Sequence, residues 1–149
     1  MTTLTKNKKA YFDYEIKKKY EAGLSLTGQE VKSAKLGRAS LKGAYVVPEG
    51  NDLYLINATI PAYQPMNAPL DYNPERRRKL LLHRKQINHL IGKSRESGLT
   101  LVPLMLYTKK GRIKLKLGVG KGKKEYKKKE KIKKRQVERK IRRSFKKEL

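Results

Sequence analysis

The sequence contains no cysteine, and its only two histidines are His83 and His89. A chain without cysteine forms no disulfide, holds no thiolate metal site and has no cysteine nucleophile. Neither histidine lies in a recognisable metal-binding or catalytic-triad motif. We therefore expect no metal and no cofactor, and the missing disulfides favour a protein of the reducing cytoplasm.

Long apolar runs are also missing. No segment approaches the ~20 residues that a membrane-spanning helix needs. The first ten residues, MTTLTKNKKA, are polar and do not resemble a signal peptide. The basic stretches carry too few apolar residues to form a strong membrane-surface helix. The sequence therefore predicts no membrane association.

Acidic side chains are scarce, 13 against 39 lysines and arginines. A metal-dependent nuclease would need carboxylates clustered around Mg²⁺. The aspartates are scattered along the chain, and only Glu15, Glu21 and Glu30 could lie near one another, which is a weak signal. The segment GVGKGKKEY lacks the loop length and the serine or threonine of a P-loop. The sequence therefore predicts that the protein is not an enzyme.

Positive charge is what the chain has in excess, with a formal net charge of +26. Residues 121–149 hold 16 basic and 4 acidic side chains, a net +12, so the first 120 residues carry the remaining +14. Such a surface attracts polyanions at long range. Nucleic acid is the polyanion that this charge favours, because each phosphate that the protein neutralises releases counterions.

Hydrophobic periodicity and turn residues divide the chain into strands, helices and a tail. In chain order we expect an extended segment over 11–26, a short helix over about 30–36, a hairpin with strands over 44–47 and 53–60, a loop over 64–74, a long helix over about 74–97, and a second hairpin whose strands meet at 109–111. This order predicts a mainly β protein with flanking helices, namely a closed antiparallel barrel of the oligonucleotide-binding kind. We expect the barrel domain to span 1–120. The basic tail, 121–149, should be disordered when free and at least partly helical once phosphates neutralise it.

Two helix starts have clear sequence signals. Thr27 and Glu30 have the spacing of a capping box, in which the two side chains satisfy free backbone donors at the start of a helix. Asn73 followed by Pro74 predicts the start of the long helix, and Gly98 follows its expected end.

Several candidate recognition residues keep two interpretations at this point. Glu30 either completes the capping box or offers a carboxylate to RNA base edges, and composition alone favours the cap. In RRRKLLLHR, Leu80 should face the core, whereas Leu81 and Leu82 could either pack or protrude toward splayed bases. His83 lies beside the expected core face, so a structural histidine is the default interpretation.

The segment RIKLKLG alternates apolar and basic residues, which predicts a strand with one core face and one row of cations. Lys114 and Lys116 lie on the basic face, and with Lys121, Lys123 and Lys124 they would form a stripe that leads into the tail. The glycines at 118, 120 and 122 could let the backbone approach phosphates closely, or only loosen the end of the strand.

Five segments occur in an order and spacing that resemble one family: NKKAYFDYEI, YEAGLSLTGQEVKSAKLGRASL, NPERRRKLLLHRKQI, GLTLVPLMLY and KLKLGVGKGKKEY. Over essentially its whole length the chain is similar to the SsrA-binding protein family, small protein B, of bacterial trans-translation. The resemblance implies an oligonucleotide-binding barrel without enzymatic activity, and a monomer in a 1:1 complex with transfer-messenger RNA. It also implies delivery of the tRNA-like domain of that RNA to stalled ribosomes, where the tail becomes helical in the message channel next to the decoding centre.

The resemblance further implies site residues. Those implied to contact RNA are Asn7, Glu30, Lys32, Leu81, His83, Lys114, Lys121, Gly122, Lys123 and Lys124. Those implied to contact the ribosome from the tail are Tyr126, Lys128, Lys129, Ile132, Arg135, Arg139 and Arg143. The chain departs from the family pattern at 127–129, where three lysines occupy positions that usually read Asp-Lys-Arg. The change removes an acid from the start of the tail.

Two other functions compete with this interpretation. A ribosomal-protein-like structural component would bind ribosomal RNA permanently and show no preference for one small RNA. A metal-dependent nuclease would cleave RNA in the presence of Mg²⁺, and a Glu30→Gln change would abolish that cleavage.

Overall fold

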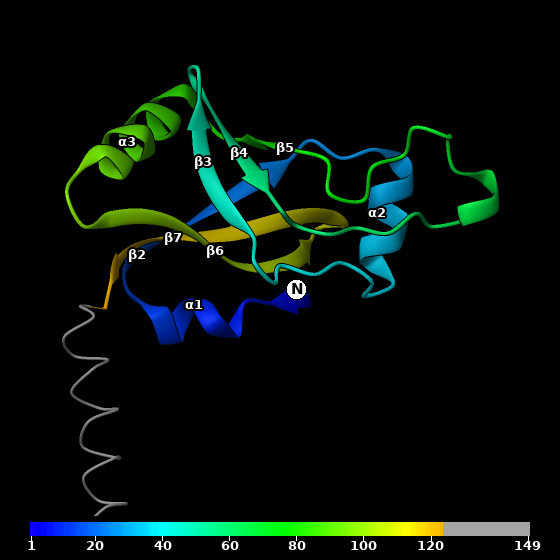
Figure 1. The fold of residues 1–149 in the computed structure, drawn as a ribbon, viewed down its shortest axis with the longest axis horizontal. Coiled ribbons are helices and arrows are strands. Elements are labelled where there is room, and N and C mark those ends of the chain that lie inside the picture. Colours follow the sequence, from blue (N-terminus) through cyan, green and yellow to red (C-terminus); the bar gives the residue numbers. More distant parts are fainter. Residues whose placement is uncertain (124–149) are drawn as a thin grey trace, which may run out of the picture.

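A computed structural model describes residues 1–123 of the chain (Figure 1). Its elements are β1 (Thr2–Lys6), α1 (Lys8–Asp13), β2 (Tyr14–Leu24), α2 (Gly28–Lys35), β3 (Tyr45–Glu49), β4 (Asp52–Ile56), the 3₁₀ helix η1 (Pro65–Asn67), β5 (Arg78–Leu81), α3 (Arg84–Arg95), β6 (Leu99–Lys109) and β7 (Arg112–Gly122). The expectation of a mainly β protein with flanking helices is confirmed. Within the described residues no helix is long and apolar enough to cross a membrane.

All the strands belong to one antiparallel sheet of seven, in the order β1-β6-β7-β2-β5-β4-β3. The sheet curls so far that β3, at one end of this order, comes against β6 near the other end (Figure 1). No ladder in the described part of the chain joins the two ends, so β1 and β3 remain edges. The expected closure of the barrel is therefore not found in the hydrogen bonding.

The concave inner face of the sheet holds the main core. The predicted alternation in β7 is confirmed, because Ile113, Leu115 and Leu117 are buried on this face. Helix α3 covers the core with Ile87, Leu90 and Ile91. The hairpin of β6 and β7 turns at 110–111, within the predicted junction at 109–111, and both turn residues have positive φ.

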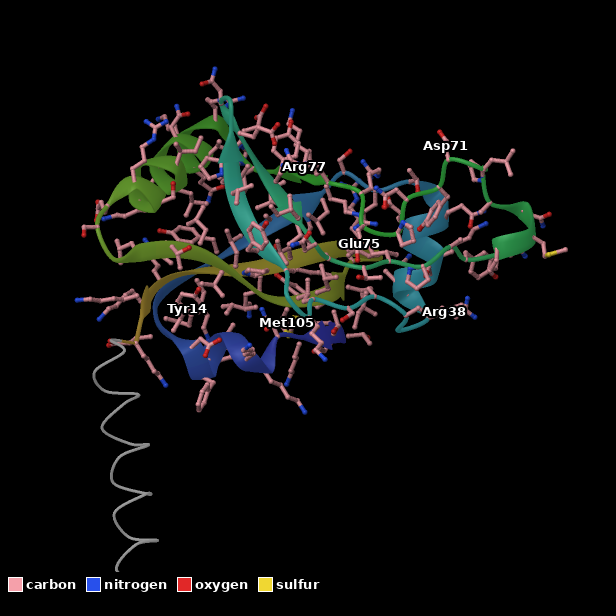
Figure 2. All side chains as sticks on the ribbon, in the orientation of Figure 1. Tyr14, Arg38, Asp71, Glu75, Arg77 and Met105 are labelled. Carbon is pink, nitrogen blue, oxygen red and sulfur yellow. The ribbon has the colours of Figure 1, made fainter. Side chains whose placement is uncertain are left out.

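The outer face of the sheet is covered at one end only. There α1 buries Ala10 against Val102 and Leu104 in a second, smaller core. Tyr14 and Met105, both labelled in Figure 2, pack against the same cluster. The other end of this face, around the start of β7, carries no helix and remains open to solvent.

Two glycines of β7 have a packing function. A Cβ at Gly118 would lie 2.8 Å from Ile16 Cγ2, and a Cβ at Gly120 would lie 3.1 Å from Tyr14 Cβ. Both glycines are buried, so they let β2 side chains pack closely and do not offer backbone to phosphates. Gly122 differs, because it is exposed and a Cβ there would meet nothing within 4 Å.

The prediction of a long helix over 74–97 is wrong for the first half of that segment. Residues 78–81 form strand β5, and α3 begins only at Arg84, with His83 as its N-cap. Burial alternates along β5, with Arg78 and Leu80 inward and Lys79 and Leu81 outward, which is the period of a strand. Pairing with β2 and β4 outweighs the local helical preference of the leucines.

The Asn73-Pro74 pair marks a turn and not a helix start. The side-chain oxygen of Asn73 accepts a hydrogen bond from the backbone amide of Glu75, and the backbone carbonyl of Asn73 accepts one from the backbone amide of Arg76. This is the local bonding that makes asparagine a common turn residue. The expected loop before it is confirmed apart from the single turn η1.

The remaining boundaries shift by a few residues. The segment expected to be extended from 11 begins as helix α1 and becomes strand only at Tyr14. Helix α2 runs from Gly28 to Lys35, where about 30–36 was expected, and its capping box is confirmed. Strand β4 ends at Ile56, before the expected 60.

Candidate nucleic-acid interface

The open end of the outer face is organised around one cross-strand row. Gly23 at the end of β2 pairs with Leu81 of β5 on one side and with Lys114 of β7 on the other. Directly paired residues point to the same side of a sheet, and Leu81 is 52% exposed. The row therefore presents an apolar side chain, a gap and a cation to solvent. It joins Leu81 and Lys114, two of the residues implied by the family resemblance.

One open depression lies on each side of this row. The one toward α3 has a volume of ≈ 470 Å³ and is lined by Glu21, His83 and Gln86 in addition to the row. The one toward α2 has a volume of ≈ 380 Å³ and is lined by Leu26, Val31 and Arg112.

His83 is exposed and lies at the start of α3. The default interpretation of a structural histidine is therefore wrong, and the imidazole is free to contact a ligand. Leu82 beside it is half-buried against the main core, so the two leucines whose orientation the sequence left open point in different directions. Leu80 is fully buried, as predicted.

Cations gather beside the row on the same face. Lys109, Lys110, Arg112 and Lys114 surround a further depression at the β6–β7 turn. Lys116 is the next residue of β7 after Lys114 on this face, and its ammonium is 5.7 Å from the centre of the Tyr107 ring. The predicted basic face of β7 is confirmed, and such a cluster suits phosphate groups.

One carboxylate remains among these cations. The Tyr107 hydroxyl donates a hydrogen bond to Glu21, and Lys109 lies 3.4 Å from the same carboxylate oxygen. The bond from Tyr107, with help from Lys109, lowers the pKa of Glu21, while burial and Glu21 raise the pKa of Tyr107. At neutral pH the face therefore holds an ionised acceptor beside its cations.

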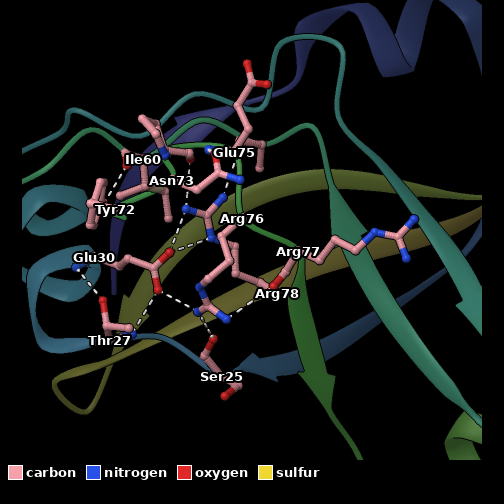
Figure 3. A network of polar contacts seen from close by, with 12 residues as sticks. Ser25, Thr27, Glu30, Ile60, Tyr72, Asn73, Glu75, Arg76, Arg77 and Arg78 are labelled. Atoms are coloured by element: carbon pink, nitrogen blue, oxygen red, sulfur yellow. Dashed lines mark hydrogen bonds and ion pairs between the residues drawn. The ribbon is translucent and has the colours of Figure 1, made fainter. Parts of the chain in front are cut away.

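Glu30 of α2 lies in a buried ion-pair network with Arg76 and Arg78 (Figure 3). Its side chain is 1% exposed. One carboxylate oxygen accepts hydrogen bonds from Arg76 Nη2 at 2.6 Å and from the Thr27 amide at 2.9 Å, and the other accepts one from Arg78 Nε at 2.8 Å. Arg78, which is 0% exposed, also donates to the carbonyls of Ala58 and Pro74.

This network determines the ionisation state and the structural role of Glu30. Burial opposes ionisation, but the donors from Arg76, Thr27 and Arg78 outweigh it and hold the pKa of Glu30 below its ordinary value. Both carboxylate oxygens are occupied inside the protein, so Glu30 does not present them to a ligand in this structure. It caps α2 and tethers the segment that leads into β5.

Arg76 and Arg78 are the functional residues that sequence reasoning missed. They lie in the run RRRK, a pattern that is typical of a charged helix face exposed to solvent. The sequence RKLL shows no alternation of polar and apolar residues, so only the burial of Arg78 and Leu80 in the folded strand places Arg78 on its inner side. The inward guanidinium of Arg78 is paired with a buried acid, and Glu30 is the acid that α2 provides.

Other residues implied by the resemblance lie away from the row. Asn7 precedes α1 at the covered end of the same outer face, where its Nδ2 donates to the carbonyl of Pro103 at 2.8 Å. Lys32 lies on α2 with its ammonium 5.6 Å from the centre of the Tyr63 ring. Asn7 therefore supports the junction of β1 and α1, and Lys32 lies at the margin of the face.

Lys121, Gly122 and Lys123 lie at the other end of β7 from Lys114. The seven residue-to-residue steps from Lys114 to Lys121 correspond to roughly 23 Å of strand. The Lys123 amide donates to the carbonyl of Asp13, and its ammonium is 5.8 Å from the centre of the Phe12 ring. Lys124 and the tail residues Tyr126, Lys128, Lys129, Ile132, Arg135, Arg139 and Arg143 lie outside the described residues, as does the prediction of a disordered or helical tail.

Within residues 1–123 no three His, Asp or Glu side chains are placed to hold a metal ion together. The carboxylates nearest the candidate face, Glu21 and Glu30, are each engaged by tyrosine, lysine or arginine donors. The face offers a ligand cations, an exposed leucine and an exposed histidine.

The chain matches the family model described as SmpB protein over residues 4–147. It is 47% identical over 142 residues to the SsrA-binding protein of Geobacillus sp. (strain WCH70), with 95% of this chain and 91% of that protein covered. It is 45% identical over 144 residues to the SsrA-binding protein of Dehalococcoides mccartyi, with 97% and 83% covered. A solved structure described as "tmRNA-SmpB: a journey to the center of the bacterial ribosome" contains a similar chain, with 42% identity, a TM-score of 0.66, and 80% of this chain and 84% of that chain covered.

Proposed function

The chain belongs to the SmpB protein family, and on this premise we propose that it is an RNA-binding adaptor of trans-translation. It binds the tRNA-like domain of transfer-messenger RNA and delivers that RNA to stalled ribosomes, so that the nascent chain is tagged and the ribosome is released. The protein is not an enzyme. The observation that carries this conclusion is the family match over nearly the whole chain, at close to half identity to named relatives.

The open outer face is the surface that suits a folded RNA. Leu81 and His83 are exposed side chains of the kinds that contact splayed bases. Lys114, Lys116 and Arg112 lie beside them to neutralise phosphates. We interpret the curled sheet as an oligonucleotide-binding-like barrel that is not closed by hydrogen bonds, with Asn7, Glu30 and Lys32 supporting the shape of the face or its margin.

The basic tail is assigned to the ribosome. On this proposal Lys121, Gly122, Lys123 and Lys124 begin a segment that follows ribosomal RNA from the decoding centre into the message channel. The tail residues Tyr126, Lys128, Lys129, Ile132, Arg135, Arg139 and Arg143 make the contacts and become helical there. The adaptor acts in the cytoplasm as a monomer bound to one RNA.

Sequencing of the RNA that copurifies with the tagged protein from its bacterial cells tests this proposal. We expect one small RNA with a tRNA-like fold to be enriched far above its share of total RNA. Copurification of intact ribosomal subunits without any enriched small RNA would instead identify a structural ribosomal component. Cleavage of the RNA during incubation with Mg²⁺ would identify a nuclease.

A further inference from the structure

The outer face has a gap at Gly23, the middle member of the Leu81–Gly23–Lys114 row. A Cβ built on Gly23 would lie 3.2 Å from Leu81 Cβ, so the missing side chain would point to the solvent side that Leu81 occupies. Gly23 is not among the glycines with positive φ. The φ at this position therefore does not require glycine, and what the glycine provides is room for the close-packed Leu81 side chain and a stretch of backbone that no side chain of its own covers.

The surroundings of the gap have the chemistry of a base-binding site. Leu81 forms an exposed apolar wall, and Lys114 forms a cationic wall opposite. The amide of Gln86 and the carboxylate of Glu21 line the depression that opens from the gap, which has a volume of ≈ 470 Å³. An amide and a carboxylate can together donate to and accept from the edge of a base.

The floor of the gap narrows the choice of ligand. Strand β2 is paired on both sides, so its backbone at Gly23 has no free edge to which a peptide strand could add. A phosphate alone would leave the leucine wall and the flat floor without contacts. An aromatic ring lying flat on the glycine would contact both and could keep its phosphate near Lys114.

We propose that this depression seats one unpaired nucleobase of the bound RNA, flat on the backbone of Gly23 between Leu81 and Lys114. Gln86 and Glu21 contact the edge of the base, and Lys114 contacts the adjoining phosphate. This inference rests on the proposed function, and it makes Gly23 and Gln86 further specificity-determining residues of the same face.

The test measures binding of the full-length chain to the tRNA-like domain of transfer-messenger RNA as a function of salt. Gly23→Ala should weaken binding about tenfold, which is the effect of losing one stacked base contact. The slope of log affinity against log salt should not change, because no phosphate contact is removed. Gly92→Ala is the matched control: Gly92 is exposed on α3 with nothing within 4 Å of a new Cβ, and binding should stay at the wild-type value.

A second measurement covers the case in which the alanine disturbs β2. Single loop nucleotides of the RNA are replaced by abasic ones, and each RNA is titrated with wild type, Gly23→Ala and Gln86→Ala. One position should cost the wild type about tenfold and cost Gly23→Ala and Gln86→Ala much less, since their seat is already impaired. Gln86 lies on the surface of α3, so its variant reports independently of β2.

The outcomes separate the two levels of the proposal. If the wild type binds the tRNA-like RNA tightly but no abasic position loses its effect in either variant, the nucleobase seat is refuted and the adaptor function stands. If the wild type binds the tRNA-like RNA no better than an unrelated RNA of equal length, the proposed function and the seat are refuted together.

Discussion

The buried carboxylate of Glu30 joins two segments that are distant in the sequence, the start of α2 and residues 76–78. It accepts from Thr27 in its own helix cap, from Arg76 at a separation of 46 residues and from Arg78 at a separation of 48 residues. Tyr72 adds to the same region by donating to the carbonyl of Ile60 at 2.7 Å. One side chain therefore sets the position of α2 relative to β5, and through β5 the position of Leu81 and His83.

A Glu30→Gln change should strongly destabilise the fold. The neutral amide leaves Arg78 charged and buried without its acid, and breaking a buried ion pair in this way costs about 3–5 kcal/mol. Denaturant unfolding followed by circular dichroism measures the free energy of unfolding of each variant.

Glu75→Gln is the matched control for this experiment. Glu75 is exposed and lies next to Arg76 in sequence, and its amide variant should change the free energy of unfolding by less than about 0.5 kcal/mol. Equal and small effects of the two changes would contradict the central role of the network.

The stabilisation by Glu30 should depend on pH in a defined direction. Its pKa is lowered in the folded state from an ordinary value of 4.5, because its donors outweigh the effect of burial. The ionised carboxylate therefore contributes its full stabilisation above that ordinary value and loses it as the pH falls through the folded pKa. The difference in unfolding free energy between wild type and Glu30→Gln should be constant near pH 7 and shrink below about pH 4.5. A difference that grows on acidification would contradict this assignment.

At the scale of elements, strand β5 shows where sequence reasoning reached its limit. The capping box of α2, the β6–β7 hairpin and the alternation of Ile113 and Leu115 depend on local signals, and all were predicted. The four residues of β5 carry leucines that suit a helix, and their strand conformation depends on pairing with β2 and β4. The contacts of Glu30 with Arg76 and Arg78 follow from that pairing, so they could not be predicted before the strand was known.

The packing of β2 against β7 leads to a prediction with an internal control. A Cβ at Gly118 would lie 2.8 Å from Ile16 Cγ2 and 3.2 Å from Leu104 Cδ1. Gly118→Ala overpacks this site and should cost about 1–3 kcal/mol of stability. Gly122→Ala, four residues along the same strand, meets nothing within 4 Å and should unfold at nearly the wild-type denaturant concentration. Similar denaturant midpoints for the two variants would show that the close packing at Gly118 does not limit the stability of the protein.

At the scale of the whole molecule, charge and shape have separate roles. The described body and the tail are both strongly basic, so both attract RNA of any sequence. If the outer face binds RNA as proposed, its shape and its few uncharged contacts supply the discrimination between RNAs. A shortened protein can therefore lose affinity and keep selectivity.

A chain that ends at Lys123 should separate these roles. Removing residues 124–149 should weaken binding to every RNA and make its salt dependence shallower, because fewer phosphates are neutralised. The ratio of affinities between the tRNA-like RNA and an unstructured RNA of equal length should stay at the full-length value. Tagging of nascent chains on stalled ribosomes in a reconstituted system should be lost. Intact tagging, or a ratio that falls to one, would refute this division between body and tail.

Strand β7 gives this division a fixed geometry. One continuous strand carries Lys114 on the open face and ends at Gly122, and the next residue, Lys123, is bonded through its amide to Asp13 at the end of α1. No flexible linker separates the two points, so the strand acts as a spacer of constant length. An RNA held on the face thereby determines where the last residues of the chain begin. The effective concentration of these residues at a second binding site is therefore set before they bind there.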